Sequence, residues 1–102
     1  MFNLQLQVDA KTEQRLKTIL AHIQNEEIFA QNIIAYQVSE LQKSLLNIRL
    51  DLKGFEEKYN QSTEDFYQQY EQGLTDDSED AMLWAGLYEM LRDNERRLQE
   101  LV

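Results

Sequence analysis

Three side-chain amides near the start of the chain have the type and spacing of groups that read DNA bases. Asn3, Gln5 and Gln7 recur at every second position. The positions beside them are apolar: Phe2, Leu4, Leu6 and Val8. This period of two predicts a β-strand with one polar and one apolar face. Paired strands can lie in the major groove of DNA, where an amide both donates to and accepts from adenine. The alternative is an ordinary polar face exposed to solvent.

Basic residues follow the predicted strand. Lys11, Arg15 and Lys17 could neutralise phosphates beside the bases, so Lys11 and Arg15 join the predicted DNA-binding residues. The next helix is expected to begin near Glu26 and Glu27, whose carboxylates oppose the binding of an anion there, although they suit the helix dipole. DNA binding and a strand that only dimerises both remain open.

A second group of candidate residues is aromatic and lies in the acidic part of the chain. Residues 61–102 contain eleven Asp and Glu but only three Arg, whereas residues 1–60 contain eight acidic and seven basic residues. Aromatic anchors framed by charge are typical of protein interfaces, and acidic surroundings indicate a basic partner. The predicted partner-binding residues are Phe66, Tyr67, Tyr70, Trp84, Leu87, Tyr88 and Leu91. The alternative is that they pack on the preceding helix as ordinary core.

Residues with catalytic or metal-binding chemistry are sparse. His22 and Glu26 stand four positions apart, but a single histidine without further ligands rarely holds a metal. Asp76, Ser78 and Asp80 imitate the first ligands of a calcium loop, whose glycine and terminal glutamate are missing here. No nucleophile has an evident base, and no glycine-rich phosphate loop is present. We therefore expect a protein that is not an enzyme and that uses no metal or cofactor.

The element that must position these groups is a long helix, expected over about 27–59. Apolar residues recur there at alternating spacings of four and three, which predicts a narrow seam for contact with another helix. The predicted dimer seam consists of Ile34, Val38, Leu41, Leu45, Ile48, Leu52 and Phe55. The seam looks too long for the rest of a 102-residue chain to cover, and an isolated strand needs a partner strand. Both features predict a homodimer or a larger assembly.

Shorter helices are expected on both sides of the long one. Asp9 suits the N-cap of a helix over 10–24, and Ser62 begins a sequence like a capping box before a short third helix that ends at Gly73. An acidic connection then leads into a last helix over about 79–101. The predicted fold is mainly α with one short N-terminal strand, divided into a dimerisation region, 1–60, and a helical partner-binding extension, 61–102.

Composition restricts the setting of the protein. The chain has no cysteine and no proline, which excludes disulfides and favours helices and a reducing cytoplasm. No stretch is apolar and long enough for a membrane span, so we expect no membrane partner.

The order of expected elements over Phe2 to about Leu46 resembles that of a ribbon-helix-helix domain: a strand, a short helix, a polar break and a long helix. The tail is similar to the C-terminal half of small prokaryotic antitoxins encoded beside a toxin gene. The segments that carry this likeness are Phe55-Glu56-Glu57-Lys58-Tyr59, Ser62-Thr63-Glu64-Asp65-Phe66-Tyr67, Asp76-Asp77-Ser78-Glu79-Asp80 and Leu83-Trp84-Ala85-Gly86-Leu87-Tyr88.

The resemblance implies a ribbon-helix-helix-like dimer that represses its own operon by binding operator DNA through the strand. It also implies that the acidic extension neutralises a basic toxin, often a ribonuclease. Two alternatives remain open from the residues alone. One is a homodimeric coiled-coil adaptor without DNA or toxin binding, and the other is a transcription regulator without a toxin.

Overall fold

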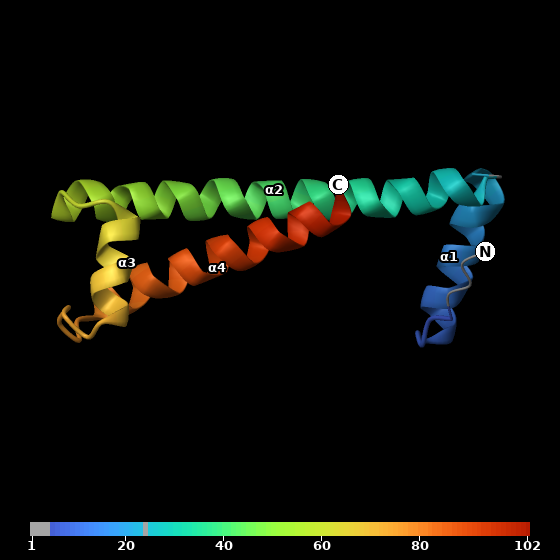
Figure 1. Cartoon of the computed structure of the whole chain (residues 1–102). Coiled ribbons are helices and arrows are strands. Elements are labelled where there is room, and N and C mark those ends of the chain that lie inside the picture. Colours follow the sequence, from blue (N-terminus) through green and yellow to red (C-terminus); the bar gives the residue numbers. More distant parts are fainter. Residues whose placement is uncertain (1–4, 24) are drawn as a thin grey trace. The chain divides into compact units, whose positions relative to one another are not determined.

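The structure is a computed structural model that describes residues 5–23 and 25–102 (Figure 1). Its helices are α1 (Ala10–Ile23), α2 (Glu26–Tyr59), α3 (Thr63–Glu71) and α4 (Glu79–Leu101). The chain divides into two compact units, which we call unit 1 (Met1–Ala35) and unit 2 (Tyr36–Val102). Helix α2 contributes its first residues to unit 1 and the remainder to unit 2. Within the described residues, no helix has the length and apolar character needed to cross a membrane.

The predicted strand is wrong, and so is the ribbon-helix-helix-like dimer built on it. Residues 5–9 form neither strand nor helix, and the described part of the chain is helical without any sheet. Leu6 and Val8 are exposed, while Phe2, Asn3 and Leu4 lie outside the described residues. A strand requires a neighbour for its backbone N–H and C=O groups. The alternating pattern defines an apolar face but supplies no such neighbour.

Two helix starts use the predicted caps, Asp9 and Ser62, and a third uses Ser78, which was not predicted as a cap. Asp9 Oδ1 accepts from the backbone N–H of Thr12 at 2.8 Å, and this hydrogen bond lowers the pKa of Asp9. Ser62 Oγ accepts from Asp65 N at 3.2 Å at the start of α3. Ser78 Oγ does the same for Ala81 N at 3.1 Å at the start of α4. Each cap satisfies a donor that the first turn of a helix leaves unpaired.

Two helix ends use left-handed backbone. Asn60 follows α2 with a φ of 50°, and the N–H of Gln61 returns to the carbonyl of Glu56. Gly73 follows α3 with a φ of 72°, and the N–H of Leu74 returns to the carbonyl of Gln69. These are the hydrogen bonds of Schellman-type ends, which reverse the chain sharply. They allow α3 to connect α2 with α4 within a few residues on each side.

The two glycines at residues 73 and 54 should respond oppositely to alanine. Gly73→Ala places a side chain on left-handed backbone and is expected to destabilise unit 2 by about 1–2 kcal/mol. Gly54→Ala lies within α2, where an added Cβ meets no atom within 4 Å. It should therefore stabilise the protein by about 1 kcal/mol. Thermal unfolding followed by circular dichroism measures both changes, and shifts of the same sign would contradict the expectation.

Unit 1 has no buried core among its described residues. Helix α1 buries none of its side chains. Large apolar side chains are instead exposed on this unit, namely Leu6, Val8, Ile19, Leu20, Ile28, Ile33 and Ile34. A fourteen-residue helix without packing partners is only marginally stable in water. Its apolar residues therefore leave unit 1 with uncovered hydrophobic surface.

Unit 2 contains the hydrophobic core, to which α2, α3 and α4 all contribute. The buried cluster consists of Ile48, Leu52, Phe66, Ala81, Trp84 and Ala85. Helix α4 runs antiparallel to α2 (Figure 1), because Asp80 near its start contacts Lys58 and Asn94 near its end contacts Ser44. Arg49 and Glu95 form a further ion pair between the two helices at 3.3 Å.

The central part of the predicted seam on α2 packs against α3 and α4 of the same chain. Leu45, Ile48 and Leu52 are buried, whereas Val38, Leu41 and Phe55 are half-buried and Ile34, in unit 1, is exposed. Helices α3 and α4 thus cover the central stretch that we expected a second copy to cover. Asn94, a polar residue in the heptad pattern of α4, donates from Nδ2 to Ser44 Oγ at 3.0 Å, so that it sets the register of α4 on α2.

Candidate partner-binding site

Trp84 lies at the centre of an aromatic stack built by three helices of unit 2. The Trp84 side chain, on α4, is 2% exposed. Phe66 of α3 stacks on it with ring centroids 4.0 Å apart and an interplanar angle of 4°. Phe55 and Tyr59 of α2 lie nearly parallel to Trp84 at 5.6 and 5.7 Å. We call these four residues the aromatic stack, and it joins α3 and α4 to the C-terminal turns of α2.

The polar edge of Trp84 is satisfied by Thr63. The indole Nε1–H donates to Thr63 Oγ1 at 3.0 Å, and both residues are buried. The backbone N–H of Thr63 in turn donates to Glu56 Oε2 at 2.8 Å. The sequence pattern predicts Thr63 only as part of a capping box and not as a core residue. The one sequence feature that could have indicated this core position is that Thr63 directly follows the N-cap Ser62.

Removing the Thr63 hydroxyl should therefore be costly. Thr63→Val keeps the shape but leaves the buried indole N–H unpaired, which should destabilise unit 2 by about 1–3 kcal/mol. Thr63→Ser keeps the hydroxyl and loses one methyl group, for which we expect about 1 kcal/mol or less. Urea unfolding measures both variants. A Thr63→Ser variant that is less stable than Thr63→Val would show that this hydrogen bond is unimportant.

Asp80, at the start of α4, connects this helix to the end of α2. Its Oδ2 accepts from Lys58 Nζ at 2.7 Å and from the Tyr59 hydroxyl. The hydrogen bond from Lys58 lowers the pKa of Asp80, and the hydrogen bond to Asp80 raises the pKa of both Lys58 and Tyr59. Lys58 is largely exposed, so this ion pair contributes little to the stability of the fold.

The remaining predicted partner-binding residues flank the stack. Tyr67, Tyr70, Leu87, Tyr88 and Leu91 are partly buried and pack against the core of unit 2. The Tyr67 hydroxyl donates to Glu89 Oε1 at 2.8 Å, which raises the pKa of Tyr67 to about 12. This hydrogen bond therefore stabilises the fold below pH 10 and is lost as the pH rises towards 12. The structure brings all seven residues together inside one chain, with their buried faces directed inward.

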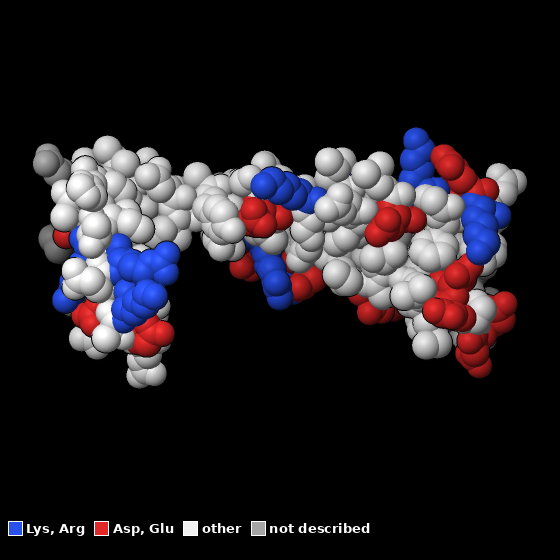
Figure 2. Space-filling view, turned by 180° about the vertical axis from the view of Figure 1, so that it is seen from behind, with Lys and Arg blue, Asp and Glu red and all other residues white. Residues whose placement is uncertain are grey.

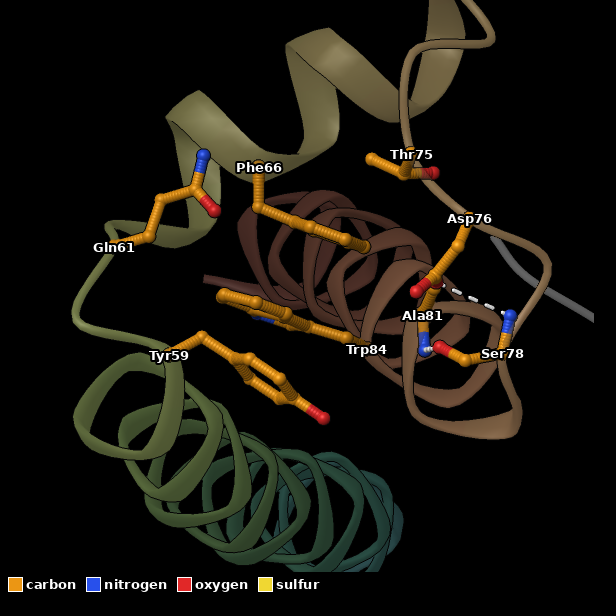
Figure 3. Close-up of a pocket in the computed structure, with 8 residues that line it drawn as sticks. All are labelled: Tyr59, Gln61, Phe66, Thr75, Asp76, Ser78, Ala81 and Trp84. Atoms are coloured by element: carbon orange, nitrogen blue, oxygen red, sulfur yellow. Dashed lines mark hydrogen bonds between the residues drawn. The ribbon is translucent and has the colours of Figure 1, made fainter.

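A pocket of about 290 Å³ opens beside the aromatic stack. Its lining comes from the end of α2, from α3, from the α3–α4 connection and from the start of α4. The lining residues are Tyr59, Gln61, Phe66, Thr75, Asp76, Ser78, Ala81 and Trp84. Figure 3 shows the rings on one side and the Asp76 carboxylate on the other, turned towards the rings. Only Tyr59, which is 46% exposed, presents a large accessible ring.

Comparisons with models of known protein families, with curated proteins and with solved structures gave no match. No family is shown for this chain.

The predicted DNA-binding residues are not arranged as a ribbon. Gln5 and Gln7 are exposed but do not lie on a strand, and Asn3 is outside the described residues. Lys11 and Arg15 are exposed on α1. Lys17, the third basic residue of α1, forms an ion pair with Glu13 at 3.2 Å. Base reading by paired strands thus loses the element on which it depended, and these basic residues remain an isolated group on α1.

The acidic residues of the calcium-like sequence are engaged in local hydrogen bonds. No cluster of three or more ligand-type side chains occurs in the described chain. In the calcium-like sequence, Asp76 Oδ1 accepts from the backbone N–H of Ser78 at 3.2 Å, and Ser78 caps α4. These side chains therefore order the connection into α4, which explains their spacing without a bound ion.

Proposed function

We propose that this chain is a binding protein that neutralises a basic protein partner, as an antitoxin does, through the acidic surface of unit 2. The observation that carries the proposal is the concentration of carboxylates in the α3–α4 connection. Residues 74–80 contain four carboxylates and no cation, and Asp76, Asp77 and Glu79 are exposed. Figure 2 is consistent with this uneven charge, since acidic side chains gather at the end of unit 2 that carries the connection.

Apolar side chains accompany these charges. Leu74, Met82 and Leu83 are exposed within or directly after the connection. An apolar contact surrounded by charge is the usual composition of a specific protein interface. The carboxylates would attract a basic surface and accelerate association, while the apolar residues would supply contact area. The likeness of the tail to antitoxins supports the same function, and occlusion of a basic RNA-binding groove is the expected mechanism.

Because Trp84 and Phe66 are buried, we assign them a supporting role in this proposal. The aromatic stack fixes the positions of α3 and α4, and the partner meets their outer surfaces. Tyr59, Leu74, Met82 and Leu83 replace the buried aromatics as the expected contact residues.

The test is co-expression of the tagged full-length chain with the protein encoded beside its gene. We expect one complex in size-exclusion chromatography with light scattering, and a neighbour that is toxic when expressed alone. If the chain elutes alone and the neighbour is harmless when expressed by itself, the proposal is overturned.

Charge variants show whether the acidic surface of unit 2 carries the binding. Glu64→Gln/Asp77→Asn/Glu79→Gln removes three exposed charges from unit 2, and Glu13→Gln/Glu26→Gln/Glu27→Gln removes three from unit 1. Exposed charge pairs contribute about 0.2–1 kcal/mol each, so the first set should weaken the complex about tenfold and the second set by much less. Equal effects of the two sets would place the partner elsewhere.

A homodimeric adaptor is the second candidate function, and the exposed apolar residues of unit 1 favour it. Unit 1 contains three basic and four acidic residues, so two copies of this unit do not repel each other strongly. Unit 2 contains fifteen acidic and seven basic residues, and two copies of it would repel. We therefore propose that two copies contact each other through unit 1, where the contact would bury exposed apolar residues.

Light scattering decides whether unit 1 dimerises. The wild type should be a dimer, and Ile33→Asp should be a monomer because it places a charge in the proposed contact. Asn32→Asp, at the neighbouring exposed position of α2, adds the same charge and should leave the dimer intact. A monomeric wild type would contradict the dimer, and the antitoxin proposal would then stand for a monomer.

A further inference from the structure

We propose that the pocket beside the aromatic stack holds the side chain of one arginine of the bound partner. This inference rests on the proposed function, because it names the partner group that the acidic surface of unit 2 would recognise. The pocket has an aromatic wall, a carboxylate opposite that wall and an opening to solvent. A planar cation with a long apolar stem matches all three features.

The aromatic wall suits the apolar stem of a long side chain. The pocket is lined by the rings of Tyr59, Phe66 and Trp84, of which Tyr59 is the most accessible. Trp84 stacks between Phe66 and Tyr59, so the faces that these rings turn towards one another are covered, and the wall offers the ligand apolar contact. Lys58 Nζ lies 5.3 Å from the centroid of the Tyr59 ring. Lys58 itself is held by Asp80 and does not line the pocket.

The opposite side of the pocket supplies the negative charge. Asp76 lines the pocket from the α3–α4 connection, and Figure 3 shows its carboxylate turned towards the rings. Its Oδ1 accepts from the backbone N–H of Ser78, which fixes the carboxylate without neutralising it. A guanidinium presents N–H donors in a flat fork that fits a carboxylate, whereas the ammonium of lysine presents a point charge. This geometry favours arginine over lysine.

The surrounding charge excludes the opposite class of ligand. Residues 74–80, which include the first two residues of α4, carry Asp76, Asp77, Glu79 and Asp80 and no basic residue. A phosphate or carboxylate ligand would be repelled there. A volume of about 290 Å³ is sufficient for the end of one long side chain. The pocket would therefore admit one arginine from a basic surface and thereby set the position of the partner on unit 2.

The experiment uses the full-length ¹⁵N-labelled chain and N-acetyl-arginine amide as the probe. Trp84 is the single tryptophan of the chain and lines the pocket, so its indole N–H, which donates to the buried Thr63, gives one NMR signal that reports on this residue. We expect a saturable shift of this signal with a dissociation constant on the order of 10 mM, as suits a small ligand with few contacts. N-acetyl-citrulline amide has the same shape without the charge that pairs with Asp76, and it should bind at least fivefold more weakly.

Two variants separate the pocket from the general acidity of the connection. Asp76→Asn keeps the acceptor for Ser78 N but removes the charge, and it should abolish the saturable shift. Asp77→Asn removes one charge from the adjacent residue, which does not line the pocket, and should leave the shift in place. Equal binding of the citrulline probe, equal effects of the two variants or no saturable shift would each overturn the inference.

The complex with the partner gives an independent readout. Asp76→Asn should weaken that complex about tenfold or more, because the partner's arginine would be left in the pocket without its counter-charge. Asp77→Asn should weaken it far less. If the partner binds wild type and both variants equally well, the pocket inference fails and the antitoxin proposal survives. If no partner binds at all, the proposed function fails, whatever the arginine probe shows.

Discussion

Trp84→Ala is expected to leave unit 2 largely unfolded at room temperature. The substitution removes the side chain that contacts all three helices and leaves the Thr63 hydroxyl without its donor. Replacement of a buried tryptophan by alanine costs about 3–5 kcal/mol. A unit of this size has a total stability of only a few kcal/mol, because small domains bury a small fraction of their surface. The loss therefore approaches the whole stability of unit 2.

Chemical unfolding followed by far-UV circular dichroism measures this effect, since the variant has no tryptophan for fluorescence. Met90→Ala, on the same helix, is the matched control because Met90 is 52% exposed. It should change the stability by less than about 0.5 kcal/mol. A Trp84→Ala variant that unfolds at nearly the wild-type urea concentration would contradict the central position of Trp84.

Leu52→Ala is expected to cost about 2–5 kcal/mol, whereas Leu50→Ala should cost less than about 0.5 kcal/mol. Both residues are leucines of α2, but Leu52 is 5% exposed and Leu50 is 58% exposed. The difference arises because α3 and α4 cover only the face of α2 that carries the heptad pattern. Equal costs would mean that this face is not the packed one.

The same pair of variants distinguishes folding within one chain from folding by association. If the core of unit 2 forms within one chain, its unfolding midpoint for wild type and for Leu52→Ala will not depend on protein concentration. If Leu52 packs against a second copy, the midpoint will rise with concentration. We expect no such dependence for the transition of unit 2, which can be followed by the fluorescence of Trp84.

The helices were predictable because their signals are local. Asp9, Ser62 and Ser78 cap helices, and Gly73 ends one, through contacts that span only a few residues. The strand failed for the opposite reason. Alternation is local, but a β-strand exists only with a neighbour, and the sequence around Gln5 does not reveal whether a neighbour is present.

The packing of residues 61–102 on α2 was harder to predict than the helices themselves. The seven-residue pattern indicates a face of α2 that packs against another helix, but the pattern is the same whether that helix is a second copy or α4. The choice depends on the sharp reversals at Asn60 and Gly73, which return the chain onto α2. The pocket could not be predicted, because it depends on the relative positions of Tyr59, Asp76 and Trp84 from separate segments.

The lack of buried side chains in unit 1 has a consequence for hydrogen exchange. Opening of α1 in a single chain exposes no core, so its backbone amides should exchange with solvent through local fraying. Amides of α2 near Ile48 and of α4 near Ala85 can exchange only when the core opens, and they should be protected much more strongly. Slow exchange of the α1 amides would therefore indicate that another surface covers this helix. The result would show this without prior identification of that surface.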